Sequence, residues 1–177
     1  ASAANLEVAD HTNLTVHPEN SHRTSVMIAS GIRGIITLSQ PVNVLEVRGP
    51  HWITPLLVSL MLLDMASGHV PMMLGAKRPN STTVSACASG ADSIGMEFEA
   101  IIRGDVDTVL TGGAEAAICP IGVAGFNACQ ALSRRNDDPT TASRPFDADR
   151  DGFVLGEGAG VLVLENLEHA LGRGAEP

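Results

Sequence analysis

The sequence is poor in aromatic and basic residues, and each scarcity excludes a class of partner. It has no tyrosine, one tryptophan and 3% aromatic residues in 177 positions, which suits a core of small side chains better than a surface for stacking bases. Its 11 basic residues stand against 20 acidic ones, so the formal net charge is −9. Nucleic acids and anionic lipid surfaces are bound through clustered cationic side chains. Neither is expected as a partner.

Cysteines and long apolar runs are scarce as well. The cysteines form no CxxC pair and are odd in number, which argues against a disulfide framework or a zinc ribbon and favours a reducing, cytoplasmic compartment. They are Cys87, Cys119 and Cys129. The most apolar stretch, residues 55–66, contains Asp64 and is too short to cross a bilayer. No targeting pattern is visible in the first residues, so we expect no membrane association.

The composition that remains is typical of a folded domain. The chain is 44% apolar and 18% charged, with 18 glycines and 10 prolines, which argues against disorder and against a coiled coil. Residues 1–24 are polar, and we expect them to be an irregular segment that is truncated at its start. Residues 25–177 carry the periodic segments and are expected to form the fold.

Strands and helices are predicted to alternate along residues 25–177. Buried-type runs predict four strands, at residues 25–32, 82–86, 107–110 and 160–164. Helical patterns occur at residues 54–68, 88–104 and 165–174. The first helix is apolar on nearly every face, which predicts burial on several sides, with Thr54 as its N-cap. Gly112 and Gly113 are expected to form a turn, and residues 132–151 a long ordered loop or several short turns. This alternation predicts an α/β fold with a mostly parallel sheet covered on both faces.

Cys87 is the strongest candidate for chemistry. It stands where a predicted strand meets a predicted helix, so a sharp turn would expose its sulfur at the positive end of the helix, which lowers the pKa of a thiol. Small neighbours leave room for a substrate. The alternative is a buried and inert cysteine, which spacing alone does not exclude. Cys119 and Cys129 stand at no such junction.

Two other motifs resemble ligand-binding loops but lack an essential feature of each. Residues 147–152 reproduce the start of a calcium loop, but Gly158 stands where a bidentate glutamate is needed. The glycines from Gly156 to Gly160 precede a strand, whereas a dinucleotide loop requires the strand first. The six histidines show no metal-binding spacing, and His69 is the least implausible partner for a cysteine nucleophile. We therefore expect no metal ion and no cofactor.

Three motifs, taken in order, resemble the β-ketoacyl-acyl carrier protein synthases of the elongating type. They are SACASG at residues 85–90, GGAE at residues 112–115 and RPFDADRDGFVLGEGAG at residues 144–160. The resemblance implies a thiolase-like fold of alternating αβαβα layers, of which this chain holds part, and a homodimer. It implies that residues 25–177 are an incomplete N-terminal half of such a domain.

The same resemblance implies roles for particular residues. Cys87 would take an acyl chain from an acyl carrier protein thioester, with its own backbone N–H as one oxyanion donor. Malonyl thioester would then lose carbon dioxide, and its carbanion would attack the acyl-cysteine to give a 3-ketoacyl product. Ile32 and Phe126 match positions that line the acyl pocket, and the glycines of the third motif shape the scaffold.

The chain also departs from the family pattern. The two catalytic histidines, a lysine and the loop that supplies the second oxyanion donor all lie beyond its last residue. Arg33 replaces a glycine at the pocket, and non-basic or weakly basic residues stand at His51, Trp52 and Gln130, where relatives often carry basic ones. Without the histidines, decarboxylation is expected to fail. A non-catalytic fragment, a polyketide ketosynthase, and a cysteine thioesterase or thiolase stay open as alternatives.

Overall fold

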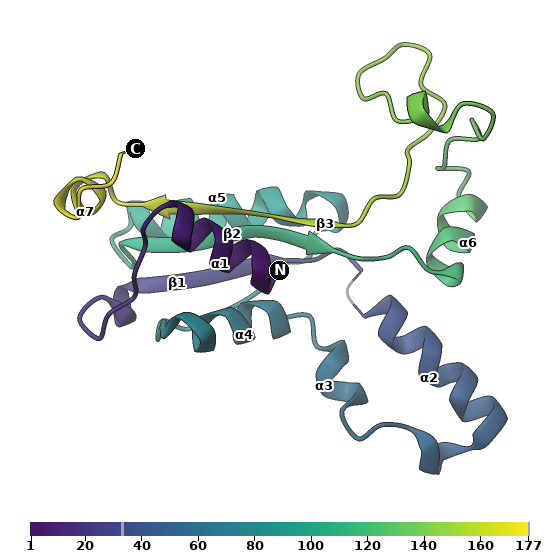
Figure 1. The fold of residues 1–177 in the computed structure, drawn as a ribbon, viewed down its shortest axis with the longest axis horizontal. Helices are drawn as coiled ribbons and strands as arrows, with labels where there is room; N and C mark the ends of the chain where they lie inside the picture. The colour runs from purple at the N-terminus through teal and green to yellow at the C-terminus, as the bar shows by residue number, and fades with distance from the viewer. Residues whose placement is uncertain (33, 177) are drawn as a thin grey trace.

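Two buried strands and a third that is partly exposed form the sheet at the centre of the molecule. In the computed structural model, which describes residues 1–32 and 34–176, β1 (Thr24–Ala29) pairs with β2 (Thr108–Glu115), and β2 pairs with β3 (Gly158–Glu165) (Figure 1). All six residues of β1 are buried. Arg33, which the sequence places at the pocket, lies outside the described residues.

The sheet is mixed, which corrects the expectation of a mostly parallel sheet. β1 and β2 run parallel, but β3 runs antiparallel to β2. The reason lies in the connection: after β2 the chain leaves through α6 (Pro120–Ala128) and a long loop and returns to the same end of the sheet, where Gly158 pairs with Glu115. A chain that re-enters at the end it left must run in the opposite direction.

Helices cover both faces of the sheet, as expected. α5 (Ser89–Ile102) packs on one face, and α1 (Ser2–His11) and α4 (Met65–Leu74) pack on the other (Figure 1). The apolar core on the second face consists of small and medium side chains without an aromatic ring. Its buried members are Ala9, Leu14, Val26, Ile28, Val70 and Leu110.

Residues 1–24 are not an irregular segment. They contain α1 and a short 3₁₀ turn, η1 (Ser21–Arg23), and they bury Ala9 and Leu14 in the core. The sequence signal is weak because most of the apolar residues of α1 are alanines and its N-terminus has no capping side chain. Tertiary packing therefore stabilises a helix that the local sequence pattern does not predict.

Ion pairs link the start and the end of the sheet to their surroundings. Arg23, just before β1, pairs with Asp107, just before β2, with 2.6 Å between Nη2 and Oδ1. At the other terminus α7 (Leu167–Gly172) follows β3, and Arg173 donates two hydrogen bonds to the carboxylate of Glu165, at 2.7 and 2.8 Å. Arg173 also donates to the carbonyl of Thr12 at 2.9 Å, which ties α7 to the end of α1.

The predicted helix at residues 54–68 is two helices. α3 (Leu57–Met61) ends where Leu62 adopts an extended conformation, and α4 follows from Met65. Thr54 does not cap a long helix; its Oγ1 accepts a hydrogen bond from the N–H of Leu56 at 3.3 Å. The expected burial is also wrong for α3, because Val58 is 72% exposed. Within the described residues α3 contacts α2, and only Leu57 and Met61 of its residues are half-buried.

Two further local predictions are corrected. Residues 82–86 form no strand in the described part of the chain, because none of them pairs with β1, β2 or β3. The segment is irregular and leads into a 3₁₀ turn, η3 (Ala86–Ala88). Gly112 and Gly113 form no turn but lie inside β2, where they allow close approach of neighbouring backbones.

Two arms project from one end of the sheet. One consists of α2 (Ile35–Arg48), a 3₁₀ turn η2 (Pro50–Trp52) and α3. The other consists of α6 and the loop that contains η4 (Pro139–Thr141), where the predicted long loop is confirmed (Figure 1). The site described next lies between the sheet and these arms.

Candidate active site

Cys87 occupies the sharp turn that precedes α5. It is the middle residue of η3, its side chain is exposed, and α5 begins two residues later at Ser89. Ala86 adopts a left-handed backbone conformation with φ of +53°, which is uncommon for a residue with a side chain. The predicted junction of turn and helix is present, although the preceding segment pairs with no strand.

The three site residues predicted from the sequence line one cavity. Cys87, Ile32 and Phe126 surround a space of about 470 Å³, together with backbone from the ends of β1 and β2 and from the start of β3. Gly113 and Gly158 form parts of this wall. Residues from five separate segments of the sequence thus line the cavity that contains Cys87.

Ile32 reaches the cavity on a turn that Glu115 holds. The N–H of Ile32 donates to Oε2 of Glu115 at 2.6 Å, and the hydroxyl of Ser30 donates to the same oxygen at 3.3 Å. A side chain at Gly31 would lie 3.1 Å from the carbonyl oxygen of Ala86. The turn that carries Ile32 therefore packs directly against the turn that carries Cys87.

Phe126 is positioned by a second ring. Its centroid lies 5.2 Å from that of Phe153, with the planes at 83° to each other, which is the favoured edge-to-face arrangement. Phe153 is fixed in turn by backbone hydrogen bonds with Ala131 and Ser133, both at 3.0 Å. The loop between α6 and β3 thus supports one side of the cavity.

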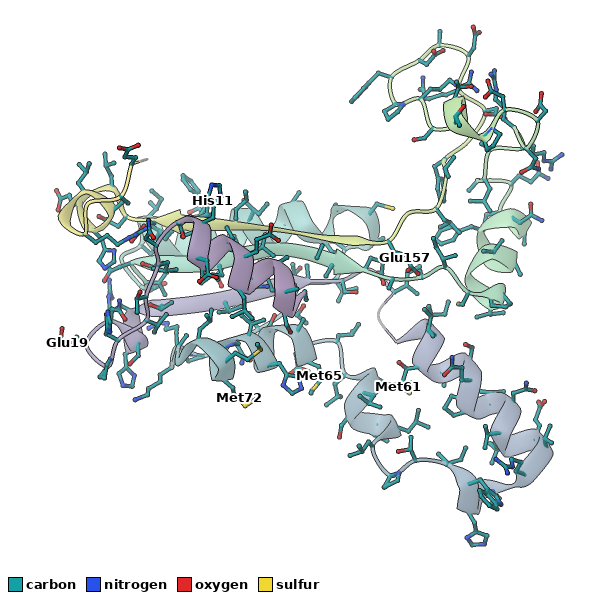
Figure 2. All side chains as sticks on the ribbon, viewed as in Figure 1. His11, Glu19, Met61, Met65, Met72 and Glu157 are labelled. Atoms are coloured by element: carbon teal, nitrogen blue, oxygen red, sulfur yellow. The ribbon has the colours of Figure 1, made fainter. Side chains whose placement is uncertain are left out.

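The motif between Gly156 and Gly160 contributes to the cavity wall and to the arm beside it. Gly156 and Gly158 line the cavity, and Oε1 of Glu157 accepts a hydrogen bond from the N–H of Ile118 at 2.8 Å. Figure 2 shows Glu157 beside the start of β3, facing the arm that carries α6. These residues link β3 to the segment before α6, which agrees with a structural role.

The cavity has few charged groups. Among its described lining residues only Cys87 and Glu115 can titrate, and no histidine is present. His69 lies exposed on α4 and is not part of the lining. In residues 1–32 and 34–176 no three histidine, cysteine or acidic side chains are placed to hold a metal ion.

Asp151 of the calcium-like motif accepts hydrogen bonds from the Ser133 hydroxyl and the Arg134 N–H, and these lower the pKa of its carboxyl.

Two residues of the site were missed by sequence reasoning. Glu115 ends β2 and holds Ile32, and Ser89 begins α5 and contacts the Cys87 turn through its hydroxyl. The only sequence signal was their place inside motifs already singled out for other residues.

None of the helices in the described part of the chain is both long and apolar enough to span a membrane.

The comparisons with known proteins agree with one another. The family model described as Beta-ketoacyl synthase, N-terminal domain, matches residues 2–170. The chain is 45% identical over 176 residues to 3-oxoacyl-[acyl-carrier-protein] synthase 2 of Synechocystis sp., and 47% identical over 175 residues to the protein of the same name from Staphylococcus aureus. These alignments include 99% of this chain but 42% and 43% of the two relatives.

Solved structures are similar over the same span. A β-ketoacyl synthase from Burkholderia phymatum has a TM-score of 0.86 and 33% identity, and the match covers 99% of this chain and 43% of that one. A type II polyketide ketosynthase in complex with its acyl-carrier protein has a TM-score of 0.83 and 30% identity, over 99% of this chain and 45% of that one. The predicted α/β class and thiolase-like fold are confirmed. The chain spans less than half the length of these relatives.

Proposed function

The chain belongs to the β-ketoacyl synthase family, and from this premise we propose that it carries the acyl-loading site of a 3-oxoacyl-acyl carrier protein synthase. The observation that carries the proposal is the meeting of Cys87, Ile32 and Phe126 around one largely apolar cavity. An acyl chain needs such a cavity beside the nucleophile.

Loading is a transfer between two thioesters. The thiolate of Cys87 attacks the carbonyl carbon of an acyl chain carried by acyl carrier protein, which forms a tetrahedral oxyanion. The bond to the carrier sulfur then breaks, and the carrier leaves as a thiol after it gains a proton. In the described part of the chain the N–H of Cys87 donates to no acceptor, which supports its use as an oxyanion donor.

Condensation would complete the reaction of the whole protein. Malonyl thioester loses carbon dioxide, and its carbanion attacks the acyl-cysteine carbonyl, which releases the Cys87 thiol and the 3-ketoacyl product. No histidine lines the described cavity, so we expect this chain alone to load an acyl group and to form no 3-ketoacyl product.

Three finer assignments belong to the same proposal. Acyl carrier protein is the proposed partner, supported by the similar ketosynthase that was solved with its carrier. A homodimer and a cytoplasmic location are proposed from the family resemblance, and three cysteines without disulfides support the second. Fatty acid elongation is preferred to polyketide synthesis, because identity is 45–47% to the named 3-oxoacyl-carrier synthases and 30% to the polyketide ketosynthase.

Intact-mass spectrometry after incubation with an acyl-acyl carrier protein thioester tests the proposal. We expect one acyl adduct on the chain, no adduct on Cys87→Ala, and an unchanged adduct on Cys129→Ala, since Cys129 is exposed but does not line the cavity. Circular dichroism checks that each variant is folded. An adduct that persists in Cys87→Ala, or none on the folded parent chain, contradicts the proposal. The second result favours the non-catalytic alternative.

A further inference from the structure

The hydroxyl of Ser89 closes the turn that carries Cys87. Ser89 is only 3% exposed. Its Oγ accepts a hydrogen bond from the N–H of Ser85 at 2.9 Å and donates one to the carbonyl oxygen of Ala86 at 2.6 Å. Both partners precede Cys87 in the chain, so a single buried hydroxyl bridges the start of α5 and the two residues that lead into the nucleophile.

This bridge acts on the strained residue of the turn. The left-handed conformation of Ala86 is unfavourable by roughly 1–2 kcal/mol for a residue with a Cβ and persists only where surrounding contacts hold it. The hydrogen bond from Ser89 is a direct contact to the Ala86 carbonyl. That carbonyl also accepts a hydrogen bond from the backbone N–H of Ser89. It lies beside Gly31, where there is room for a backbone but little for a side chain.

Loss of the hydroxyl would leave the N–H of Ser85 unsatisfied, because it has no other acceptor in the described part of the chain. The Ala86 carbonyl would lose its short bond from the hydroxyl and keep the one from the Ser89 N–H. The turn could then relax to an ordinary backbone conformation. Because Cys87 follows Ala86 directly, such a rotation would move both its N–H and its sulfur.

We propose that Ser89 is a positioning residue for acyl transfer, which acts through Ala86 to hold the N–H and the sulfur of Cys87 in one productive geometry. The proposal rests on the acyl-loading function above. Ser89 forms no bond to the substrate. Its contribution is to fix the position of the oxyanion donor relative to the nucleophile. This matters because a misplacement of about 1 Å can slow a reaction on the order of 100-fold.

The chain offers a matched control one helical turn further on. Ser93 is fully buried on the same face of α5, and its one O–H is shared between the carbonyl oxygens of Gly90 and Gly112, which lie 2.9 and 2.8 Å from Oγ. In the described part of the chain its side-chain hydrogen bonds go to Gly90, Gly112 and Thr111 and to no residue of η3. Ser93→Ala therefore removes a similar buried hydroxyl and is expected to lower stability without altering the nucleophile.

Two reactions of Cys87 separate positioning from folding. Acyl transfer from a carrier thioester develops an oxyanion, whereas alkylation by iodoacetamide does not. We expect Ser89→Ala to slow acylation at saturating thioester by on the order of 10-fold or more, and alkylation by less than about threefold. Ser89→Thr, which keeps the hydroxyl, should restore acylation, and Ser93→Ala should leave the ratio of the two rates unchanged. An unchanged ratio in Ser89→Ala, or an equal change in Ser93→Ala, overturns the inference.

Hydrogen exchange of the peptide that spans residues 84–89 measures how well the turn is held, and it requires no acyl transfer. We expect faster exchange in Ser89→Ala than in the parent, and recovery in Ser89→Thr. Equal exchange in Ser89→Ala and the parent overturns the inference. If the parent shows no acyl adduct at all, the proposed function fails, and this measurement still decides whether Ser89 holds the turn.

Discussion

At the scale of single residues, Gly112 is the position where the sheet tolerates no side chain. Its φ is +152°, and an added Cβ would overlap the carbonyl oxygen of Gly160 on β3. Backbone strain and overpacking each destabilise by about 1–3 kcal/mol, so we expect Gly112→Ala to lower the free energy of unfolding by about 2–6 kcal/mol. Urea titration followed by circular dichroism measures the change.

A second glycine serves as the control for that prediction. Gly95 lies inside α5 with no atom within 4 Å of the position a Cβ would take. Gly95→Ala should raise the free energy of unfolding by about 0.5–1 kcal/mol, because alanine favours a helix. Equal urea midpoints for the two variants would show that the close approach of β2 and β3 does not limit the sheet.

Glu97 is a single residue that opposes the fold at neutral pH. It is 6% exposed on the inner face of α5, where Oε1 accepts from the Ser25 hydroxyl at 3.2 Å and Oε2 has no partner in the described residues. Burial raises the pKa of its carboxyl. A raised pKa means that the folded state prefers the protonated form, so its contribution to stability is largest below the pKa of the unfolded chain and is lost as pH rises through the folded value.

Substitution of Glu97 should therefore change stability in a pH-dependent way. We expect Glu97→Gln to unfold at a higher temperature than the parent at pH 8, with the difference shrinking as pH falls toward 4.5, the ordinary value for a glutamate. Thermal unfolding at several pH values provides the measurement. Glu99→Gln, on the exposed side of the same helix, should show no such trend. A constant difference across pH would rule out titration of Glu97.

At the scale of elements, the local sequence pattern predicts a helix and its end where both depend on neighbouring residues. The helix that becomes α5 was predicted with its end at Gly104, and the left-handed Gly104 does terminate it, with its N–H bonded to the carbonyl of Ile101 at 2.9 Å. The direction of β3 was not predictable, because it depends on where a long loop returns. The break between α3 and α4 at Leu62 has no local signal, because a run that is apolar on every face is compatible with one long helix or with two short ones.

In the candidate site, too, some residues are predictable from the sequence and others are not. Cys87 was predicted from its place at a turn before a helix, and Ile32 and Phe126 from a family resemblance. Ser89 and Glu115 act by holding backbone, which leaves no periodic signal. Glu115 in particular contacts a turn 83 residues away. Only the folded chain reveals that contact.

The turn between β1 and α2 is the element that Glu115 should control. Removal of the carboxylate in Glu115→Ala leaves the N–H of Ile32 without its acceptor. We expect this amide to lose its protection from hydrogen exchange, while the amides of β1 residues such as Val26, held by the strand pairing, keep theirs. Glu99→Ala removes an exposed glutamate and should leave Ile32 protected. Equal protection of Ile32 in both variants would contradict the role assigned to Glu115.

At the scale of the whole molecule, apolar side chains lie on the outside of several elements. Val47 on α2, Val58 on α3, Met72 on α4 and Ile102 on α5 are all at least 66% exposed. Figure 2 shows Met72 on the outer side of α4, away from the sheet. β1 and β3 are the edges of the described sheet. Large exposed apolar surfaces and open edges favour association of folded chains.

This surface predicts the behaviour of the chain in solution. We expect light scattering coupled to gel filtration to give masses above the 18.4 kDa monomer at concentrations on the order of 100 μM. Val58→Glu places a charge on the apolar side of α3 and should lower the mean mass. The neighbouring Ser59→Glu adds the same charge at an exposed polar position and should leave the mean mass unchanged, because it removes no apolar contact. A monodisperse monomer for the parent chain would mean that these faces do not associate, and equal effects of the two glutamates would attribute any shift to net charge rather than to apolar burial.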